Sequence, residues 1–225
     1  MPTLDVSKYG RLGISAQSSH ANARDAATAS NVLLNYGGSA AGAIQYARTA
    51  GRGAPQYHIF RTFYYFDTSG ITGTVSAATL NIKGYLRNTG DCIVVPSTAF
   101  AGDGSADVVV AEYDSISFNT NYGSEFASWS TSANNSITLA STALANIKDN
   151  DFFICAVIEH DHDFLDSDSG ATLSARCGVD YDTPVAFLDY TIASGYANTV
   201  LGVAPANIGK VSGVATADIE DVIGV

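Results

Sequence analysis

The sequence predicts an all-β protein, a jelly-roll β-sandwich followed by a C-terminal extended repeat arm. The chain holds 12 Tyr and 10 Phe but only one Met and one Trp, and aromatic residues favour strands. Short strand-like runs separated by turn residues follow one another, with no alternation of strands and helices. Near residue 194 the composition changes to a short repeat rich in Val and Gly.

Composition excludes several classes of protein. With 46% hydrophobic and 15% charged residues, the chain is expected to be globular. A net charge of −11 argues against nucleic acid as a partner, because phosphate contacts need Lys and Arg. No apolar run approaches the length of a membrane helix, so no membrane partner is expected. Cys92, Cys155 and Cys177 lack metal or redox spacing, so we expect buried, reduced thiols and folding in a reducing cytoplasm.

The clearest strand signal is the run His58–Phe66, which is rich in aromatic and β-branched residues. Its alternation predicts that the odd-numbered residues from Ile59 to Tyr65 share one face. A turn at Asp67–Gly70 separates this run from a second long strand at Val75–Leu86. A helical turn is expected at 141–147, and shorter strands are expected at 32–36, 43–47, 92–96, 108–113, 136–139, 152–159, 171–175 and 185–192.

Two neighbouring stretches resemble a known family. Arg61–Ile71 reads Arg-Thr-Phe-Tyr-Tyr-Phe-Asp-Thr-Ser-Gly-Ile, and Val75–Ile82 reads Val-Ser-Ala-Ala-Thr-Leu-Asn-Ile. Together they resemble the signature R-x-F-x-x-F-D-x-S-x-I … V-x-x-A-T-L-x-I of jelly-roll modules in phage structural proteins, which are related to DNRLRE-type β-sandwiches of bacterial surface proteins. Residues 19–25, 137–147 and 177–190 resemble the opening, helical turn and closing strand of these modules, so the resemblance spans about residues 15–192.

The resemblance implies a structural role. Ile208–Val214, which reads Ile-Gly-Lys-Val-Ser-Gly-Val, is similar to the I-x-K-V-x-G-V tails that end many phage virion proteins. The family's Arg/Glu pair before the closing strand is reduced here to Arg176. From the residues themselves, Arg61 and Asp67 are expected to be structural, since the aromatic strand fills a sandwich core and Asp67 accepts turn N–H groups.

From Ala197 to Val225 the chain repeats with a period of about eleven residues and a shared Val-x-Gly-Val core. Each unit is too short to bury its own apolar residues, which predicts a sandwich body at 1–193 and an assembly arm at 194–225. If extended, each core places its two valines on opposite faces, with Gly permitting close backbone approach. The predicted assembly residues are Val200, Gly202, Val203, Val211, Gly213, Val214, Val222, Gly224 and Val225.

An acidic stretch after the strand at 152–159 is the candidate metal site. Asp166–Gly170 reads Asp-Ser-Asp-Ser-Gly, a fragment common in calcium loops, although a full EF-hand pattern is absent. His160 and His162 share a face if they lie in a strand, which suggests a transition metal instead. A solvated acidic loop is the third interpretation. The predicted calcium ligands are Glu159, Asp161, Asp163, Asp166 and Asp168.

The chain contains no nucleophile elbow, zinc-protease motif or phosphate-binding loop, so no enzyme is predicted. We expect a non-enzymatic phage virion structural protein on the particle exterior, as capsid decoration or a tail-associated module. Its expected partners are other virion proteins and itself, as a trimer or higher homo-oligomer. The alternatives are a glycan-binding module for a host surface, with exposed aromatic loops near Tyr113, Tyr122 and Trp129, and a bacterial adhesin domain.

Overall fold

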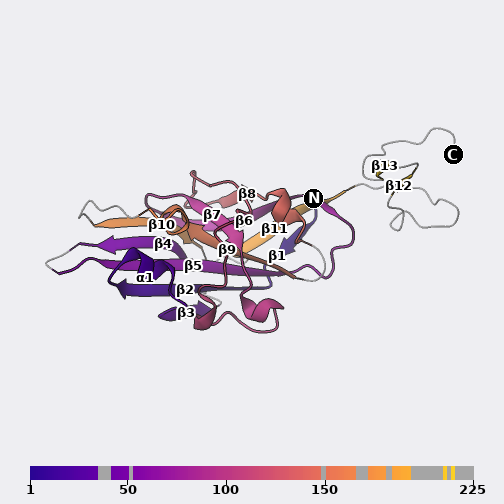
Figure 1. The fold of residues 1–225 in the computed structure, drawn as a ribbon. Helices are drawn as coiled ribbons and strands as arrows, with labels where there is room; N and C mark the ends of the chain where they lie inside the picture. The colour runs from indigo at the N-terminus through magenta and orange to yellow at the C-terminus, as the bar shows by residue number, and fades with distance from the viewer. Residues whose placement is uncertain are drawn as a thin grey trace.

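The computed structural model describes residues 1–34, 42–50, 53–147, 151–165, 172–180 and 184–193, and the backbone of two short strands at 210–211 and 214–215. Strands hold 51% of the residues and helices 11%, which confirms the predicted all-β class. The strands form two layers (Figure 1). Within the described residues, no helix is long and apolar enough to cross a membrane.

The smaller layer carries the N-terminus. Its four antiparallel strands follow the order β1-β11-β6-β8, so strands from both ends of the body lie side by side. Residues Ala186–Ile192 of β11 run along the first half of β6, which buries Leu80, Ile82 and Leu188. The bounds are β1 (Thr3–Asp5), β6 (Val75–Arg87), β8 (Asn134–Thr138) and β11 (Ala186–Ile192).

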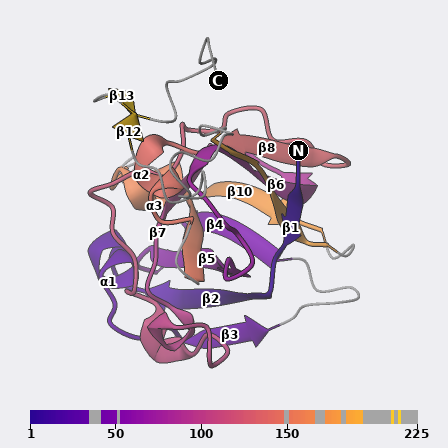
Figure 2. The same ribbon diagram turned by 90° about the vertical axis from the view of Figure 1, so that its right-hand side faces the viewer.

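The larger layer is built around β5, whose edges carry three partners. β2 pairs along one edge, while β4 pairs with the first half of the other edge and β9 with the second half. β10, β4, β5, β2 and β3 therefore follow one another across the layer (Figures 1 and 2). The bounds are β2 (Lys8–Gln17), β3 (Asn31–Leu34), β4 (Gly42–Thr49), β5 (Gln56–Asp67), β7 (Cys92–Pro96), β9 (Asp151–Ile158) and β10 (Leu173–Val179).

The pairings nest along the chain as in a jelly roll. β1 pairs with β11, β5 with β9, and β6 with β8. Innermost, β7 pairs with the segment that contains Tyr122 and Phe126, through backbone bonds to Val94 and Cys92. This order gives the layers β1-β11-β6-β8 and β5-β9-β7, which is the wrapping of a jelly roll. β2, β3, β4 and β10 extend the second layer, and β10 joins the two layers by pairing with the end of β6.

Both faces of the second half of β5 are buried. Its odd-numbered residues lie under the segment 97–118, where Tyr65 packs beside Phe100 and Arg61 lies over the Tyr113 ring. Its even-numbered residues Thr62, Tyr64 and Phe66 are also buried. Buried residues therefore follow one another without alternation along this half of β5. The reason is that segment 97–118 covers the face that solvent would otherwise contact.

Most predicted elements are present, with one clear exception. The long strands and the helical turn α2 (Ser141–Leu144) are confirmed. The strand predicted at 108–113 is wrong, because Val110–Glu112 form a 3-10 turn, η2. The Glu112 carboxylate stabilises this turn by accepting bonds from the backbone N–H groups of Val109 at 2.9 Å and Ala101 at 2.8 Å.

The middle repeat of the predicted arm forms a small sheet of its own. β12 (Lys210–Val211) and β13 (Val214–Ala215) pair antiparallel with each other, and Val211 is the register partner of Val214. Val211 and Val214 therefore lie on two paired strands and not on one extended strand, and the faces on which their side chains lie stay a prediction.

The rest of the arm lies outside the described residues. This includes the repeat cores at 200–203 and 222–225 and the predicted assembly residues within them. The boundary between a body at 1–193 and an arm at 194–225 therefore stays a prediction. The last described residue of the body, Ala193, is still tied to it, because its N–H donates to the carbonyl of Thr74 at 2.8 Å.

Candidate functional site

A buried ion pair joins Arg61 on β5 to Asp161 in the helical turn α3 (Glu159–His162). Arg61 Nε donates to Asp161 Oδ2 at 2.8 Å and an Nη2 hydrogen donates to Oδ1 at 2.9 Å, so the contact is bidentate. Both side chains are 0% exposed. The arginine that sequence reasoning assigned to structure therefore has a structural partner 100 residues along the chain.

The same guanidinium holds two more segments. Its Nη1 donates to the carbonyl of Tyr113 at 2.9 Å and its Nη2 to that of Arg24 at 2.7 Å. The Tyr113 ring lies 4.0 Å from the guanidinium carbon, within range of a cation–π contact. Burial works to lower the pKa of Arg61, but the charge of Asp161 opposes burial and the net effect raises it. Arg61 is therefore a permanent cation inside the protein.

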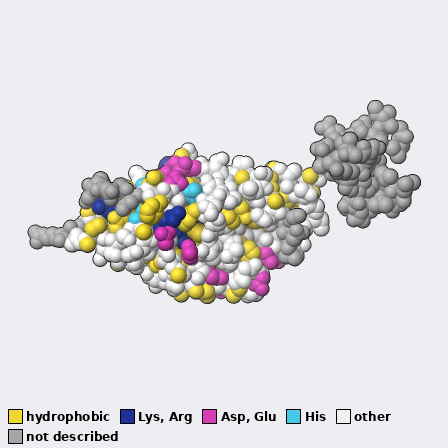
Figure 3. All heavy atoms as spheres, viewed as in Figure 1, with side chains coloured by type: hydrophobic (Ala, Val, Ile, Leu, Met, Phe, Trp, Pro, Cys, Tyr) yellow, Lys and Arg dark blue, Asp and Glu magenta, His cyan; other side chains and the backbone are white. Residues whose placement is uncertain are grey.

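Arg24 supports the same helical turn from outside. It ends α1 (His20–Arg24), whose N-cap Ser19 accepts a bond from the backbone N–H of Asn22 at 3.1 Å. Arg24 Nε donates to the carbonyl of Asp161 at 2.7 Å, and its guanidinium carbon lies 4.2 Å from the centre of the Phe118 ring. Basic, acidic and histidine side chains gather close together on the face shown in Figure 3.

Among the described residues, the structure does not bring the predicted calcium ligands together. Asp161 is buried in an ion pair with Arg61, so its assignment as a calcium ligand is wrong. Asp163 contacts His162. Residues 159–162 form a helical turn rather than a strand, so His160 and His162 do not share the predicted face. His160 instead stacks on Tyr46 with ring centres 5.2 Å apart. The remaining predicted ligands, Asp166 and Asp168, lie outside the described residues.

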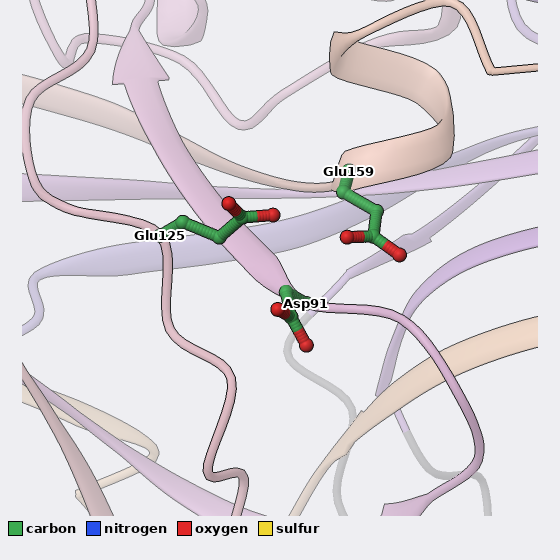
Figure 4. Close-up of side chains that lie close together, drawn as sticks. All are labelled: Asp91, Glu125 and Glu159. Atoms are coloured by element: carbon green, nitrogen blue, oxygen red, sulfur yellow. The ribbon is translucent and has the colours of Figure 1, made fainter.

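Glu159 belongs to a different acidic cluster, formed with Asp91 and Glu125 (Figure 4). One carboxylate oxygen from each lies within 4.8 Å of the others. Asp91 precedes β7, Glu125 lies on the segment that pairs with β7, and Glu159 begins α3 with its N–H bonded to the carbonyl of Asp91 at 2.9 Å. These ligands suit a hard cation. Among the described residues this is the group that could hold calcium, and calcium binding stays a prediction.

The carboxylates of the cluster affect one another. Glu125 is exposed at the surface. Partial burial, followed by the contact with Glu159 and the charge of Asp91, raises the pKa of Glu125. Sequence reasoning singled out only Glu159 of the three, because the others are isolated acidic residues that only the folded chain brings together.

The thiols have no chemical role that the structure supports. Cys92, Cys155 and Cys177 are free and buried, as predicted. Burial raises the pKa of all three, that of Cys177 to about 12. They therefore stay protonated, and a protonated thiol is a poor nucleophile and a poor metal ligand.

The glycan-binding alternative expects exposed aromatic loops near three residues whose side chains are buried, so exposure at these positions is wrong. Tyr113, Tyr122 and Trp129 are 0%, 6% and 4% exposed. Their polar atoms find partners inside the protein: the Tyr113 hydroxyl donates to the carbonyl of Ala23 at 3.0 Å, and Trp129 Nε1 to that of Gly178 at 3.0 Å. The loops that carry them fold onto the sheets and contribute to the core.

No protein-family model and no curated protein sequence matches this chain. The similarity to phage jelly-roll modules therefore rests on the quoted residues and on the nested strand order, and assignment to that family stays a prediction.

Replacing Asp161 with Asn should destabilise the protein strongly. The change leaves the Arg61 guanidinium buried without a counter-charge, which typically costs about 3–5 kcal/mol. The matched control is Arg87→Gln, which removes a contact with Asp91 of 3.6 Å between partly exposed side chains and should cost less than about 1 kcal/mol. Urea unfolding measures both, and similar losses for the two variants would contradict a structural role for the pair.

Glu125→Gln should stabilise the fold slightly at neutral pH. The folded state raises the pKa of Glu125, so ionising this group costs more in the folded than in the unfolded protein, and stability falls as pH rises through the raised pKa. The gain should not exceed about 0.5 kcal/mol, because solvent screens exposed charges. It should vanish below the ordinary pKa of 4.5, where wild type is protonated in both states. Thermal unfolding of both proteins at neutral pH and below pH 4.5 measures the difference. An equal effect of the substitution at the two pH values would refute the prediction.

Proposed function

We propose that this chain is a non-enzymatic structural protein of a phage virion, displayed on the particle exterior as capsid decoration or as a tail-associated module. The observation that carries the proposal is the eleven-residue repeat that follows the closing strand β11. Its described unit pairs with itself in a separate two-stranded sheet and not with the strands of the body. A repeat of this kind supplies a surface for contacts with another subunit.

The polar groups of the body support a structural role. The buried charges bond to each other and to backbone carbonyls, and the thiols are buried and protonated. Such groups hold segments together and leave no activated nucleophile among the described residues. The net charge of −11 keeps copies of the chain soluble when many are displayed on one particle.

Deleting residues 194–225 should leave a soluble, folded body that no longer joins the particle. Among the described residues, Leu188 is the last buried one and β11 ends at Ile192, so the deletion begins beyond the closing strand. Circular dichroism and thermal unfolding of the truncated protein test the fold. Electron microscopy of particles carrying labelled full-length or truncated chains tests incorporation. Unfolding or aggregation of the truncated chain would show that the arm belongs to the core.

The full-length protein should self-associate through the repeat as a trimer or a higher closed ring. Replacing Gly202, Gly213 and Gly224 with Val should reduce assembly, because Gly permits the close backbone approach that the predicted contacts of the repeat need. Light scattering measures the mass, and Gly70→Val, at an exposed position with open space around it, serves as the control. A wild-type monomer at high micromolar concentration would instead assign the arm to a different virion protein.

A further inference from the structure

We propose that a hollow between β7, β9 and α2 binds a carbohydrate. This inference goes beyond the structural role and does not depend on it. The hollow has a volume of about 480 Å³, which lies in the range of small-molecule sites. Its lining mixes aromatic, hydroxyl, amide and carboxylate side chains: Pro96, Ser97, Thr98, Tyr122, Ala145, Asn146, Asp151, Phe152 and Phe153.

The wall formed by Tyr122 and Asn146 is pre-organised. Asn146 Nδ2 donates to the Tyr122 hydroxyl oxygen at 2.8 Å and to the carbonyl of Thr142 at 3.0 Å. The Tyr122 ring stacks on Phe152 with ring centres 5.7 Å apart. These contacts use the amide donors of Asn146, so its Oδ1 is left as an acceptor and the Tyr122 hydroxyl proton as a donor for a ligand.

Asp151 supplies the strongest acceptor of the lining. One of its carboxylate oxygens, Oδ1, accepts the hydroxyl of Tyr65 at 2.6 Å, which fixes the side chain. The second oxygen remains for a ligand hydroxyl. The neighbouring Phe153 is half-buried, and its ring stacks on Tyr65 with centres 5.1 Å apart. A carboxylate next to an aromatic ring is suited to a sugar, whose hydroxyls bond at the edge while its C–H face packs on the ring.

A second, smaller hollow of about 190 Å³ adjoins the first and shares Pro96, Ser97 and Thr98 with it. Two backbone bonds tie this segment to its neighbour, from Thr98 N–H to Ser115 at 2.8 Å and from Ser117 N–H to Pro96 at 3.2 Å. The smaller hollow adds further hydroxyl and carboxylate groups, from Asp114, Ser115 and Ser117. Two adjoining hydroxyl-rich hollows suit two linked sugar units.

The charge of the lining selects the ligand class. None of the described residues that line either hollow is Lys or Arg, while Asp114 and Asp151 are acidic. A phosphate or another anion would be repelled. Ser97 Oγ accepts a bond from the N–H of Ala99 at 3.0 Å and so keeps its proton for donation. The lining thus offers both donors and acceptors next to an aromatic ring, which matches a neutral saccharide.

The proposal is tested with the full-length protein by NMR, using glucose, maltose, N-acetylglucosamine and chitobiose at millimolar concentration as probes. We expect saturation transfer to at least one sugar, with the disaccharide of that sugar binding more tightly than the monosaccharide. Thr98→Arg should weaken binding by about tenfold or more. Thr98 lines both hollows, and the larger side chain would occupy space that the sugar needs. Thr98 is exposed, and within the described part of the chain its one hydrogen bond is donated by its backbone N–H, so the fold should tolerate the change.

Two further variants keep the test decisive. Thr131→Arg adds the same side chain at an exposed position before β8, at the end of that strand away from α2, and should bind as wild type does. Asp151→Asn keeps the shape and the acceptor for Tyr65 and should weaken binding several-fold. The proposal is overturned if none of the four sugars binds wild type, or if the Thr98→Arg and Thr131→Arg proteins bind equally well.

Discussion

The arrangement of the body depends on one buried ion pair, that of Arg61 with Asp161. Moving two charges out of water costs several kcal/mol per ion, and their attraction offsets this only when the remaining polar groups are also bonded. Here the guanidinium makes four hydrogen bonds, to Asp161 and to the carbonyls of Tyr113 and Arg24. One side chain on β5 thereby positions α1, the end of η2 and α3.

Because Arg61 holds these segments, they cover the outer face of the larger layer. Segment 97–118 lies over β5, and the turn α3 is held by Arg24 as well as by Arg61. The ordered segment also forms the wall that the two proposed sugar subsites share at Pro96–Thr98. The segment that covers the sheet therefore also contributes to the proposed binding surface. The repeat follows β11 and forms a separate small sheet.

Local pattern was enough to predict the all-β class, the long strands β5 and β6 and the buried thiols, because strand propensity and turn residues act over short distances. It was not enough to pair Arg61 with Asp161, since a charged residue in an acidic stretch looks solvated until the fold buries it. The cluster of Asp91, Glu125 and Glu159 was missed because Asp91 and Glu125 are isolated in the sequence and only the folded chain brings the three together. The pairing of Lys210–Val211 with Val214–Ala215 was missed because a Val-x-Gly-Val core fits an extended strand equally well.

Hydrogen exchange of the Arg61 Nε–H group, followed by NMR, measures whether the body depends on the Arg61–Asp161 pair. A buried, bidentate Nε–H is released only when the surrounding structure opens, so its protection reports the stability of the whole arrangement. The ion pair at 0% exposure predicts that this proton exchanges as slowly as the backbone amides of β5. Exchange as fast as that of the partly exposed Arg87 side chain would show that the ion pair does not hold the body together.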